Sequence, residues 1–207
     1  MAAPTLLKPT ASQLFQPFSK LPGSLVPTSL QVMKFSGVYV HIDDDKKWFD
    51  WASFKSAVDN YSGDDLAIDK FKSTTISRSE STVTVMVEKI VNFLRDALAI
   101  IIDPKELAAT IEATFTNLKE AKSNGWADFS KESSQNNSSW EYRILFAVPN
   151  PDLDEWFYSL VTTIKLTADI QEESSWWGLV SSSSKNFSAT VDAMELVVQK
   201  GFKNPKA

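Results

Sequence analysis

Few side chains in this sequence could carry out acid–base or nucleophilic chemistry. The 207 residues contain no cysteine and a single histidine, which leaves no thiolate nucleophile and no set of histidine or cysteine metal ligands. Three carboxylates, Asp152, Asp154 and Glu155, are close enough in sequence to suggest a glycosidase pair. They follow a Pro-Asn-Pro segment, however, and carboxylates in such a turn are exposed to solvent rather than held in position for catalysis. We therefore predict no catalytic site, no metal site and no cofactor.

The remaining candidates for polar chemistry have simple structural interpretations. His41 lies in the β-rich stretch 34–42 without a visible partner, so we interpret it as a strand residue. The acidic run 43–45 is most simply a solvated turn and helix cap, with loose cation binding as the alternative. The sequons at Asn136 and Asn186 are interpreted as a polar loop and a strand.

The net charge of the chain limits the kinds of partner that it can bind by electrostatic attraction. The formal net charge is −5, and no run of lysine or arginine offers a nucleic-acid surface, so we expect no nucleic acid as partner. A weak basic tilt near the C-terminus would permit contact with lipid phosphate or a sulfated glycan. It consists of Lys185, Lys200, Lys203 and Lys206.

The element that organises the rest of the chain is a helical hairpin predicted over residues 83–122. Its first helix, residues 83–102, carries apolar residues at the spacing that places side chains on one helix face. An Asp-Pro corner at 103–104 then ends one helix and begins the next, with Asp103 as the cap. Gly125 is expected to supply a left-handed exit after the second helix.

After the hairpin, the period of the apolar residues changes from that of a helix to that of strands. We predict strands over residues 140–148, 156–170 and 187–193, each with one apolar face. The second is unusually long for a strand. Near residues 194–198 the alternation slips, which suggests a bulge or a helical end. Such strands fit a helix-covered sheet, and they are also long enough to cross a bilayer.

The region before the hairpin gives weaker signals. We expect a proline-rich extended segment over residues 1–33, a strand over 34–42, a helix over 46–61, a short helix over 64–72 and a polar connector over 73–82. The first strand and the helices thus occupy 34–122, and the sheet strands occupy 139–200. The first residues hold no continuous apolar run of the ~7–15 residues that a secretory signal needs, so we expect neither a signal peptide nor a membrane-spanning helix.

Residues 113–150 contain Phe115-Thr116-Asn117-Leu118 at a helix end, Trp126 after a polar turn, an Asn/Ser-rich loop at 135–139 and a strand from Tyr142 to Ala147 that ends at Asn150. In these features the region resembles the signature region of the Cyt-type δ-endotoxins and of volvatoxin, their mushroom relative, a family of pore-forming cytolysins. The proline-rich start and the tryptophan pair at 176–177 depart from the pattern, as expected of a fungal or otherwise distant member.

The resemblance implies a fold and a function. The fold would be a single three-layer α/β domain over residues 1–207, with an antiparallel sheet between amphipathic helical hairpins. The function would be that of a secreted or released soluble toxin that binds membrane lipid, oligomerises and permeabilises cells, without enzymatic activity. Whether such proteins act through an ordered pore or by detergent-like disruption stays open. The alternative is a carbohydrate- or lipid-binding module that never inserts.

The apolar faces of the predicted elements then become candidate membrane-interacting surfaces. The candidate helix face is Val87, Ile90, Val91, Leu94, Leu98 and Ile101. The candidate strand face is Trp156, Tyr158, Leu160, Ile164 and Leu166. Trp176 and Trp177 would be either headgroup anchors or packing residues at a sheet corner.

Overall fold

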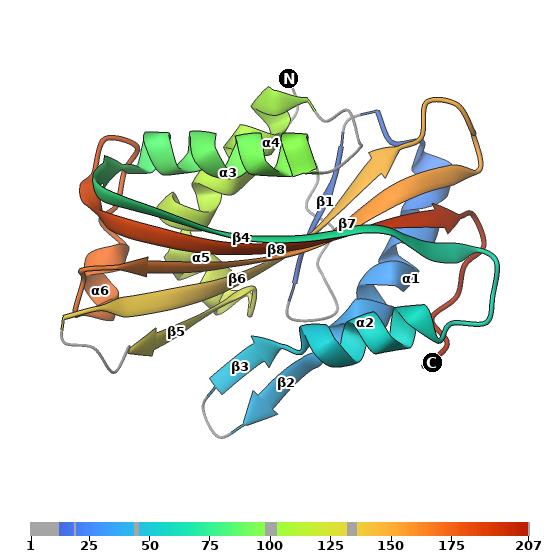
Figure 1. The fold of residues 1–207 in the computed structure, drawn as a ribbon, viewed down its shortest axis with the longest axis horizontal. Helices are drawn as coiled ribbons and strands as arrows, with labels where there is room; N and C mark the ends of the chain where they lie inside the picture. Colours follow the sequence, from blue (N-terminus) through green and yellow to red (C-terminus); the bar gives the residue numbers. More distant parts are fainter. Residues whose placement is uncertain (1–12, 19, 44–45, 98–102, 132–135, 207) are drawn as a thin grey trace. The chain divides into compact units, whose positions relative to one another are not determined.

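The computed structural model describes residues 13–18, 20–43, 46–97, 103–131 and 136–206 (Figure 1). The helices within these ranges are the 3-10 helix η1 Gly23–Leu25, α1 Val26–Gly37, α2 Trp51–Asp59, α3 Val83–Ala97, α4 Pro104–Thr116, α5 Leu118–Ser123 and α6 Glu173–Trp176. The strands are β1 Leu14–Pro17, β2 Val40–Asp43, β3 Lys46–Phe49, β4 Leu66–Thr82, β5 Ala127–Lys131, β6 Ser138–Pro149, β7 Trp156–Ala168 and β8 Ser184–Gln199.

The strands form a six-stranded sheet and a separate two-stranded sheet. The larger sheet has the order β1-β6-β7-β8-β4, with β5 paired to β6, and the smaller one joins β2 to β3. β5 runs antiparallel to β6, but β1 runs parallel to it, with Leu14 opposite Ile144. The sheet is therefore mixed, and the prediction of a wholly antiparallel sheet is corrected at this strand.

The chain divides into two compact units, which are described separately. Unit 1 comprises residues 1–71, 143–162 and 193–207, and unit 2 comprises residues 72–142 and 163–192. The four long strands β4, β6, β7 and β8 contribute residues to both units.

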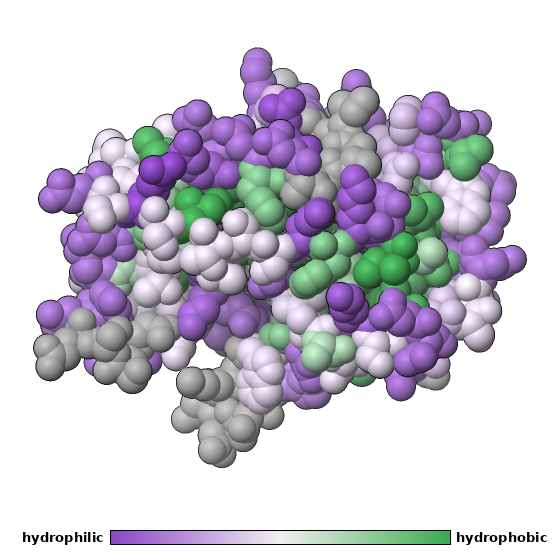
Figure 2. Space-filling view, viewed as in Figure 1, coloured by the Kyte–Doolittle hydropathy of each residue, from purple (hydrophilic) through white to green (hydrophobic). Residues whose placement is uncertain are grey.

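Unit 2 contains the predicted helical hairpin. α3 buries one face and exposes the other, which carries Glu88, Asn92, Arg95 and Asp96. Figure 2 shows mostly hydrophilic residues over this helix. The buried face consists of Val83, Met86, Val87, Ile90, Val91 and Leu94. The first helix of the hairpin is thus confirmed as amphipathic over residues 83–97; Leu98, Ile101 and Ile102 lie outside the described residues.

Local chemistry fixes where the hairpin helices begin and end. The Asp103 carboxylate accepts a hydrogen bond from the backbone N–H of Lys105 at 2.8 Å, and Pro104 occupies the first turn, where a missing N–H costs nothing. The expected second helix is divided at Asn117 into α4 and α5. Gly125 has a φ of 80°, so the left-handed exit is confirmed.

The strand segments of unit 2 have one apolar face, as predicted. In β8, the buried Phe187, Ala189 and Val191 alternate with the partly exposed Ser188 and Thr190. In β7, Ile164, Leu166 and Ala168 are buried, whereas Lys165 is exposed. Phe115 of α4 packs edge-on against Phe187, with ring centroids 5.5 Å apart. The hairpin therefore contributes side chains to the same core as the apolar side of the strands.

Strand β4 replaces both the short helix predicted over 64–72 and the connector predicted over 73–82. β4 is the last strand in the sheet order, and its Thr75 and Ser77 hydroxyls lie 3.2 Å and 3.1 Å from those of Thr190 and Ser188 on β8. Cross-strand hydroxyl pairs stabilise a strand that buries little apolar surface. A polar edge strand carries no apolar alternation, so the sequence pattern missed it.

A buried chain of hydrogen bonds anchors α6 within unit 2. The Trp176 indole N–H donates to the Ser138 hydroxyl at 2.7 Å, and that hydroxyl donates to the backbone carbonyl of Ile170. Trp176 and Ser138 are both fully buried. Since a buried indole N–H without a partner is costly, this chain fixes the side chain of Trp176.

Unit 1 is built around aromatic side chains from α1, α2 and the strands. Its core includes Phe35, Phe54, Phe157 and Phe202, and the Phe35 ring lies 5.6 Å from that of Phe54 and 6.1 Å from that of Phe202. The first of these pairs is edge-on and the second is tilted, and aromatic pairs of this kind stabilise a core beyond the area they bury.

Three predictions for unit 1 are wrong at their boundaries. The extended segment expected over 1–33 is helical from Gly23 onward, where η1 and then α1 begin; Pro27 lies in the first turn of α1, where proline is tolerated. The strand expected over 34–42 begins only at Val40, because residues 34–37 complete α1. The helix expected over 46–61 is instead strand β3 followed by α2, since pairing with β2 outweighs local helical spacing.

In unit 1, the strand segments place residues of the opposite parity in the core, and Leu160 and Ala193, which keep the parity of unit 2, are buried as well. In β8, Met194, Leu196 and Val198 belong to the core of unit 1, and in β7, Phe157 and Val161 do so. β8 continues as a strand to Gln199, so no helix begins near residue 194. The slip in alternation near residue 194 marks the point where the apolar core residues of β8 move from odd-numbered to even-numbered positions. The expectation of a single apolar face along each whole strand is therefore wrong.

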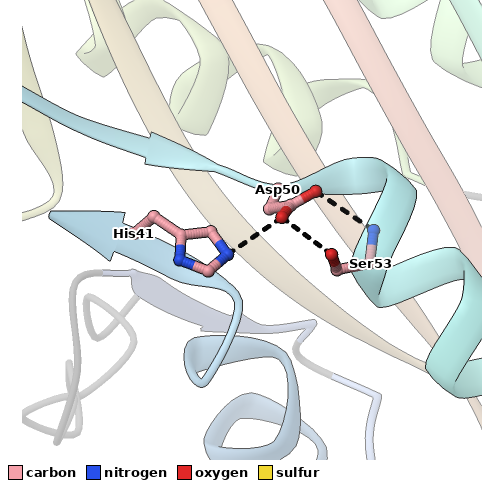
Figure 3. Close-up of polar contacts among 3 residues, drawn as sticks. All are labelled: His41, Asp50 and Ser53. Carbon is pink, nitrogen blue, oxygen red and sulfur yellow. Dashed lines mark hydrogen bonds and ion pairs between the residues drawn. The ribbon is translucent and has the colours of Figure 1, made fainter. Parts of the chain in front are cut away.

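An acidic cap begins α2 in unit 1 (Figure 3). Asp50 accepts hydrogen bonds from the backbone N–H of Ser53 at 3.0 Å and from its hydroxyl at 2.8 Å, and it pairs with the His41 Nε2 at 2.9 Å. The bonds from Ser53 are the main cause that lowers the pKa of Asp50, with a smaller contribution from His41. The cap therefore depends on the ionised carboxylate.

We predict that Ser138→Ala lowers the free energy of unfolding by about 2 kcal/mol, because it leaves the buried indole N–H of Trp176 unpaired. Trp176→Phe removes that N–H, so it should cost less in the Ser138→Ala background than in the wild type. Denaturant titration of the four proteins in this cycle measures the difference. Additive costs would contradict a hydrogen bond between the two side chains.

We predict that Asp50→Ala lowers the melting temperature at neutral pH, and that the difference from wild type shrinks in acid. A carboxyl whose folded pKa is lowered contributes stability above its unfolded pKa and loses it as the pH falls through the folded value. Asp50→Asn keeps an acceptor for Ser53 and should be intermediate. Thermal melts across the acidic range test this, and an effect that is the same at every pH would refute it.

Candidate functional site

The polar cluster around His41 has the wrong connectivity for nucleophilic catalysis. The Ser53 hydroxyl donates to the Asp50 carboxylate rather than to His41, so Asp50 lies between the serine and the histidine, and the imidazole is not placed to take the proton of the serine. The His41 ring lies 5.6 Å from that of Trp48 on the neighbouring strand. The structure thus shows that Asp50 is the partner of His41, which the sequence did not reveal. The role of Asp50 is to cap α2.

The carboxylates that suggested a glycosidase pair are solvent-exposed. Asp152, Asp154 and Glu155 lie in the turn between β6 and β7, where the Asn150 side chain accepts the backbone N–H of Asp152 at 2.9 Å. No group of three or more potential metal ligands occurs within the described ranges. Among the helices that these ranges contain, none combines the length and apolarity needed to cross a bilayer.

The candidate helix face lies in the core of unit 2. Val87, Ile90, Val91 and Leu94 of α3 are all buried, whereas Leu98 and Ile101 fall outside the described residues. This face is unavailable to lipid while α3 stays packed, so membrane contact through it requires the helix to leave.

The candidate strand face is divided between the two units. Trp156, Tyr158 and Leu160 belong to unit 1, and Ile164 and Leu166 belong to unit 2. Leu160, Ile164 and Leu166 are fully buried, and Trp156 and Tyr158 are half-buried. Burial and nearby acidic groups, Glu195 first among them, raise the pKa of Tyr158.

The two tryptophans proposed as headgroup anchors have different environments. Trp176 is fully buried and hydrogen-bonded to Ser138, so in this conformation it packs at the end of the strands. Trp177 is 40% exposed, and the Lys119 ammonium lies 5.2 Å from its ring centroid. Only Trp177 is placed to meet a membrane surface without rearrangement.

Sequence reasoning missed the exposed turn that follows Trp177. Val180 is 56% exposed, and the Ser181 hydroxyl donates to the Glu112 carboxylate of α4. The two partners are far apart in sequence and neither belongs to an apolar pattern, so no sequence signal links them. The exposed aliphatic side chain in a serine-rich turn was the available hint.

The sequence is similar to a known protein family and to individual toxins within it. Residues 40–201 match the family model described as Bacillus thuringiensis toxin. The type-1Ba cytolytic delta-endotoxin of Bacillus thuringiensis subsp. neoleoensis is 29% identical over 87 residues, which cover 41% of this chain and 32% of that protein. The type-2Aa cytolytic delta-endotoxin of subsp. kyushuensis is 25% identical over 135 residues, 63% of this chain and 51% of that protein. The chain spans at most about half of these relatives' length.

Solved structures share the fold. A delta-endotoxin superposes with a TM-score of 0.78 at 21% identity, over 99% of this chain and 93% of that one. The activated Cyt2Ba monomer from Bacillus thuringiensis subsp. israelensis gives a TM-score of 0.75 at 17% identity, over 89% of this chain and 97% of that one. The α/β class with a mixed sheet and helices is therefore that of Cyt toxins. With the family model covering most of its length, the chain belongs to the Bacillus thuringiensis toxin family of Cyt-type cytolytic delta-endotoxins.

Proposed function

We propose that this protein is a cytolytic toxin that binds membrane lipid, associates with further copies of itself on the membrane and permeabilises the cell. The observation that carries the proposal is the amphipathic helix α3, whose buried face shares the core of unit 2 with strands that are themselves amphipathic. Family membership supports the same conclusion, since the relatives are named cytolytic delta-endotoxins.

The hydrophobic effect explains why α3 packs within unit 2 in water and why it would leave that unit at the surface of a bilayer. In water, the apolar face of α3 is satisfied only by packing within unit 2. At a membrane surface, that face can instead enter the headgroup and acyl boundary while Glu88 and Arg95 stay in water. The bilayer therefore binds the released helix but not the packed one, which shifts the equilibrium toward release.

Release of the hairpin would uncover strands suited to self-association. The uncovered side of unit 2 would present Ile164, Leu166 and Phe187, while Lys165 and Thr190 would keep a polar side. Lipid cannot satisfy the backbone groups of an open sheet edge, so uncovered strands need the edges of other copies. β4, the last strand in the sheet order, offers such an edge.

The same proposal assigns the protein's action to the membrane and not to an enzymatic step. Its place of action is the surface of a target cell, reached after release from the producing cell. Contact of the C-terminal lysines with a sulfated glycan stays a prediction, as does the volvatoxin-like character inferred from residues 113–150.

We predict that the protein releases a small trapped dye from phosphatidylcholine vesicles with a steep dependence on protein concentration, because permeabilisation requires several copies. A large trapped marker is measured in parallel. Release of only the small marker indicates a pore of limited size, and release of both indicates detergent-like disruption. Vesicle binding without release of either marker would refute the cytolytic proposal and identify a non-lytic lipid-binding module.

We predict that tethering the hairpin strongly slows leakage. The chain has no native cysteine, so Glu112→Cys with Ser181→Cys gives one reactive pair, placed where those two side chains are in contact. A short thiol-cleavable bis-maleimide then ties α4 to the turn before β8. We expect the leakage rate to fall roughly tenfold or more, equivalent to at least 1.4 kcal/mol in the barrier.

Cleavage of the linker provides the matched control, since it removes the tether and leaves the two substitutions and their maleimide adducts in place. Recovery of leakage after cleavage shows that the tether, and not the substitutions, caused the loss. Undiminished leakage by the tethered protein would show that the hairpin need not separate from this turn.

A further inference from the structure

An exposed apolar turn follows α6 in unit 2. Within residues 177–183, here called the serine turn, Trp177 and Val180 are 40% and 56% exposed. Val85, in the first turn of α3, is 38% exposed. These three are half of the large apolar side chains that the structure shows as exposed; the others are Val38, Trp48 and Leu153.

The side chains of the serine turn suit the interface of a phospholipid membrane. A tryptophan beside an aliphatic residue is the composition that partitions at headgroup depth. The Lys119 ammonium over the Trp177 ring places a cation at the same level, where lipid phosphates lie. Lys122, also on α5, is already paired with Glu173. Of these two lysines, Lys119 is therefore the one that can meet a lipid phosphate beside Trp177.

The backbone of the serine turn also holds the start of α3. The Ser183 carbonyl accepts the N–H of Val83 at 3.0 Å, and the Ser181 carbonyl accepts the N–H of Thr84 at 3.1 Å. The Thr84 hydroxyl donates to the same carbonyl at 3.0 Å. The first N–H groups of a helix have no partner within the helix, so the serine turn supplies acceptors that α3 otherwise lacks.

The same turn reaches the second helix of the hairpin and is closed on itself. The Ser181 hydroxyl donates to Glu112 of α4. The Val180 N–H donates to the Ser183 hydroxyl at 2.9 Å, and the Ser183 N–H donates to the Val180 carbonyl at 2.9 Å. A displacement of Val180 therefore moves the carbonyls that hold α3 and the hydroxyl that holds α4.

We propose that the serine turn is a lipid-sensing clasp: insertion of Trp177 and Val180 into a phospholipid surface pulls its acceptors away from α3 and α4 and releases the hairpin. The inference rests on the proposed cytolytic function and names the element that meets the membrane first. The occupant is the phospholipid headgroup region, because the exposed apolar pair and Lys119 match its apolar and anionic layers. A second copy of the chain or a carbohydrate would give a different outcome below.

Two single-cysteine variants test the lipid contact, Val180→Cys and Leu153→Cys, each labelled with an environment-sensitive fluorophore. Leu153 is the matched control because it is 52% exposed and lies in unit 1. On phosphatidylcholine vesicles, emission at position 180 should shift to the blue and rise severalfold, whereas emission at position 153 should not change. A change at 180 that needs other copies of the protein but no lipid, or that follows soluble sugar, would overturn the proposal.

A matched tryptophan pair gives a second readout that needs no label. Trp177→Ser should raise the lipid concentration for half-maximal binding roughly tenfold, which corresponds to 1.4 kcal/mol. Trp48→Ser removes an equally exposed tryptophan, 39% against 40%, from unit 1 and should leave binding unchanged. Equal losses in the two variants would show that the serine turn has no special part in binding.

Loosening the clasp tests its coupling to the hairpin. Glu112→Ala combined with Thr84→Val removes the side-chain bonds to Ser181, so leakage per bound protein should begin sooner than in wild type. Glu88→Ala, on the exposed face of α3, is the control and should leave the onset unchanged. Slower or unchanged leakage by the loosened variant, with melting temperatures showing that it is folded, would overturn the coupling.

The vesicle experiments distinguish a failure of the cytolytic function from a failure of the clasp. If the wild type neither binds nor permeabilises vesicles, the proposed cytolytic function fails. If it does both while the label at 180 stays silent and Trp177→Ser binds normally, the function holds and the clasp is refuted.

Discussion

The structure of unit 2 depends on the burial of one apolar strand face by a helical hairpin. Phe187, Ala189 and Val191 are buried on that side of β8, and Phe115 of α4 packs directly on Phe187. The opposite side carries the partly exposed Ser188 and Thr190. In water the apolar side therefore needs a cover, which the hairpin supplies, and under the proposed function lipid would replace that cover once the hairpin leaves.

The fold was predictable wherever a single face of an element is buried. The α3 stripe and the alternation in β7 produce clear periods of 3.6 and 2, and Asp103 with Pro104 marks a helix start by chemistry alone. β4 was missed because its stability comes from pairing with β8, including Thr75 with Thr190, and such partners are remote in sequence. The slip near Met194 was misread because the apolar residues move from odd-numbered to even-numbered positions there, while the chain continues as the same strand.

The candidate site was predictable as a set of faces and not as a set of contacts. The hydrophobic residues of α3 follow from its amphipathic pattern, but the pattern cannot say that Trp176 is buried against Ser138 while Trp177 is exposed. The contacts of the serine turn with Thr84 and Glu112 join parts of the chain that no local rule relates. His41 likewise found its partner, Asp50, only through the pairing of β2 with β3.

The proposed mechanism requires the hairpin to separate from the strands of unit 2 when the protein permeabilises a membrane. Spin labels on Asn92→Cys and Lys165→Cys, both exposed positions within unit 2, would report the distance between α3 and β7 in a chain without native cysteines. We predict a narrow distance distribution in solution and a longer, broader one on phosphatidylcholine vesicles that leak. An unchanged distribution on vesicles that have leaked would contradict the account.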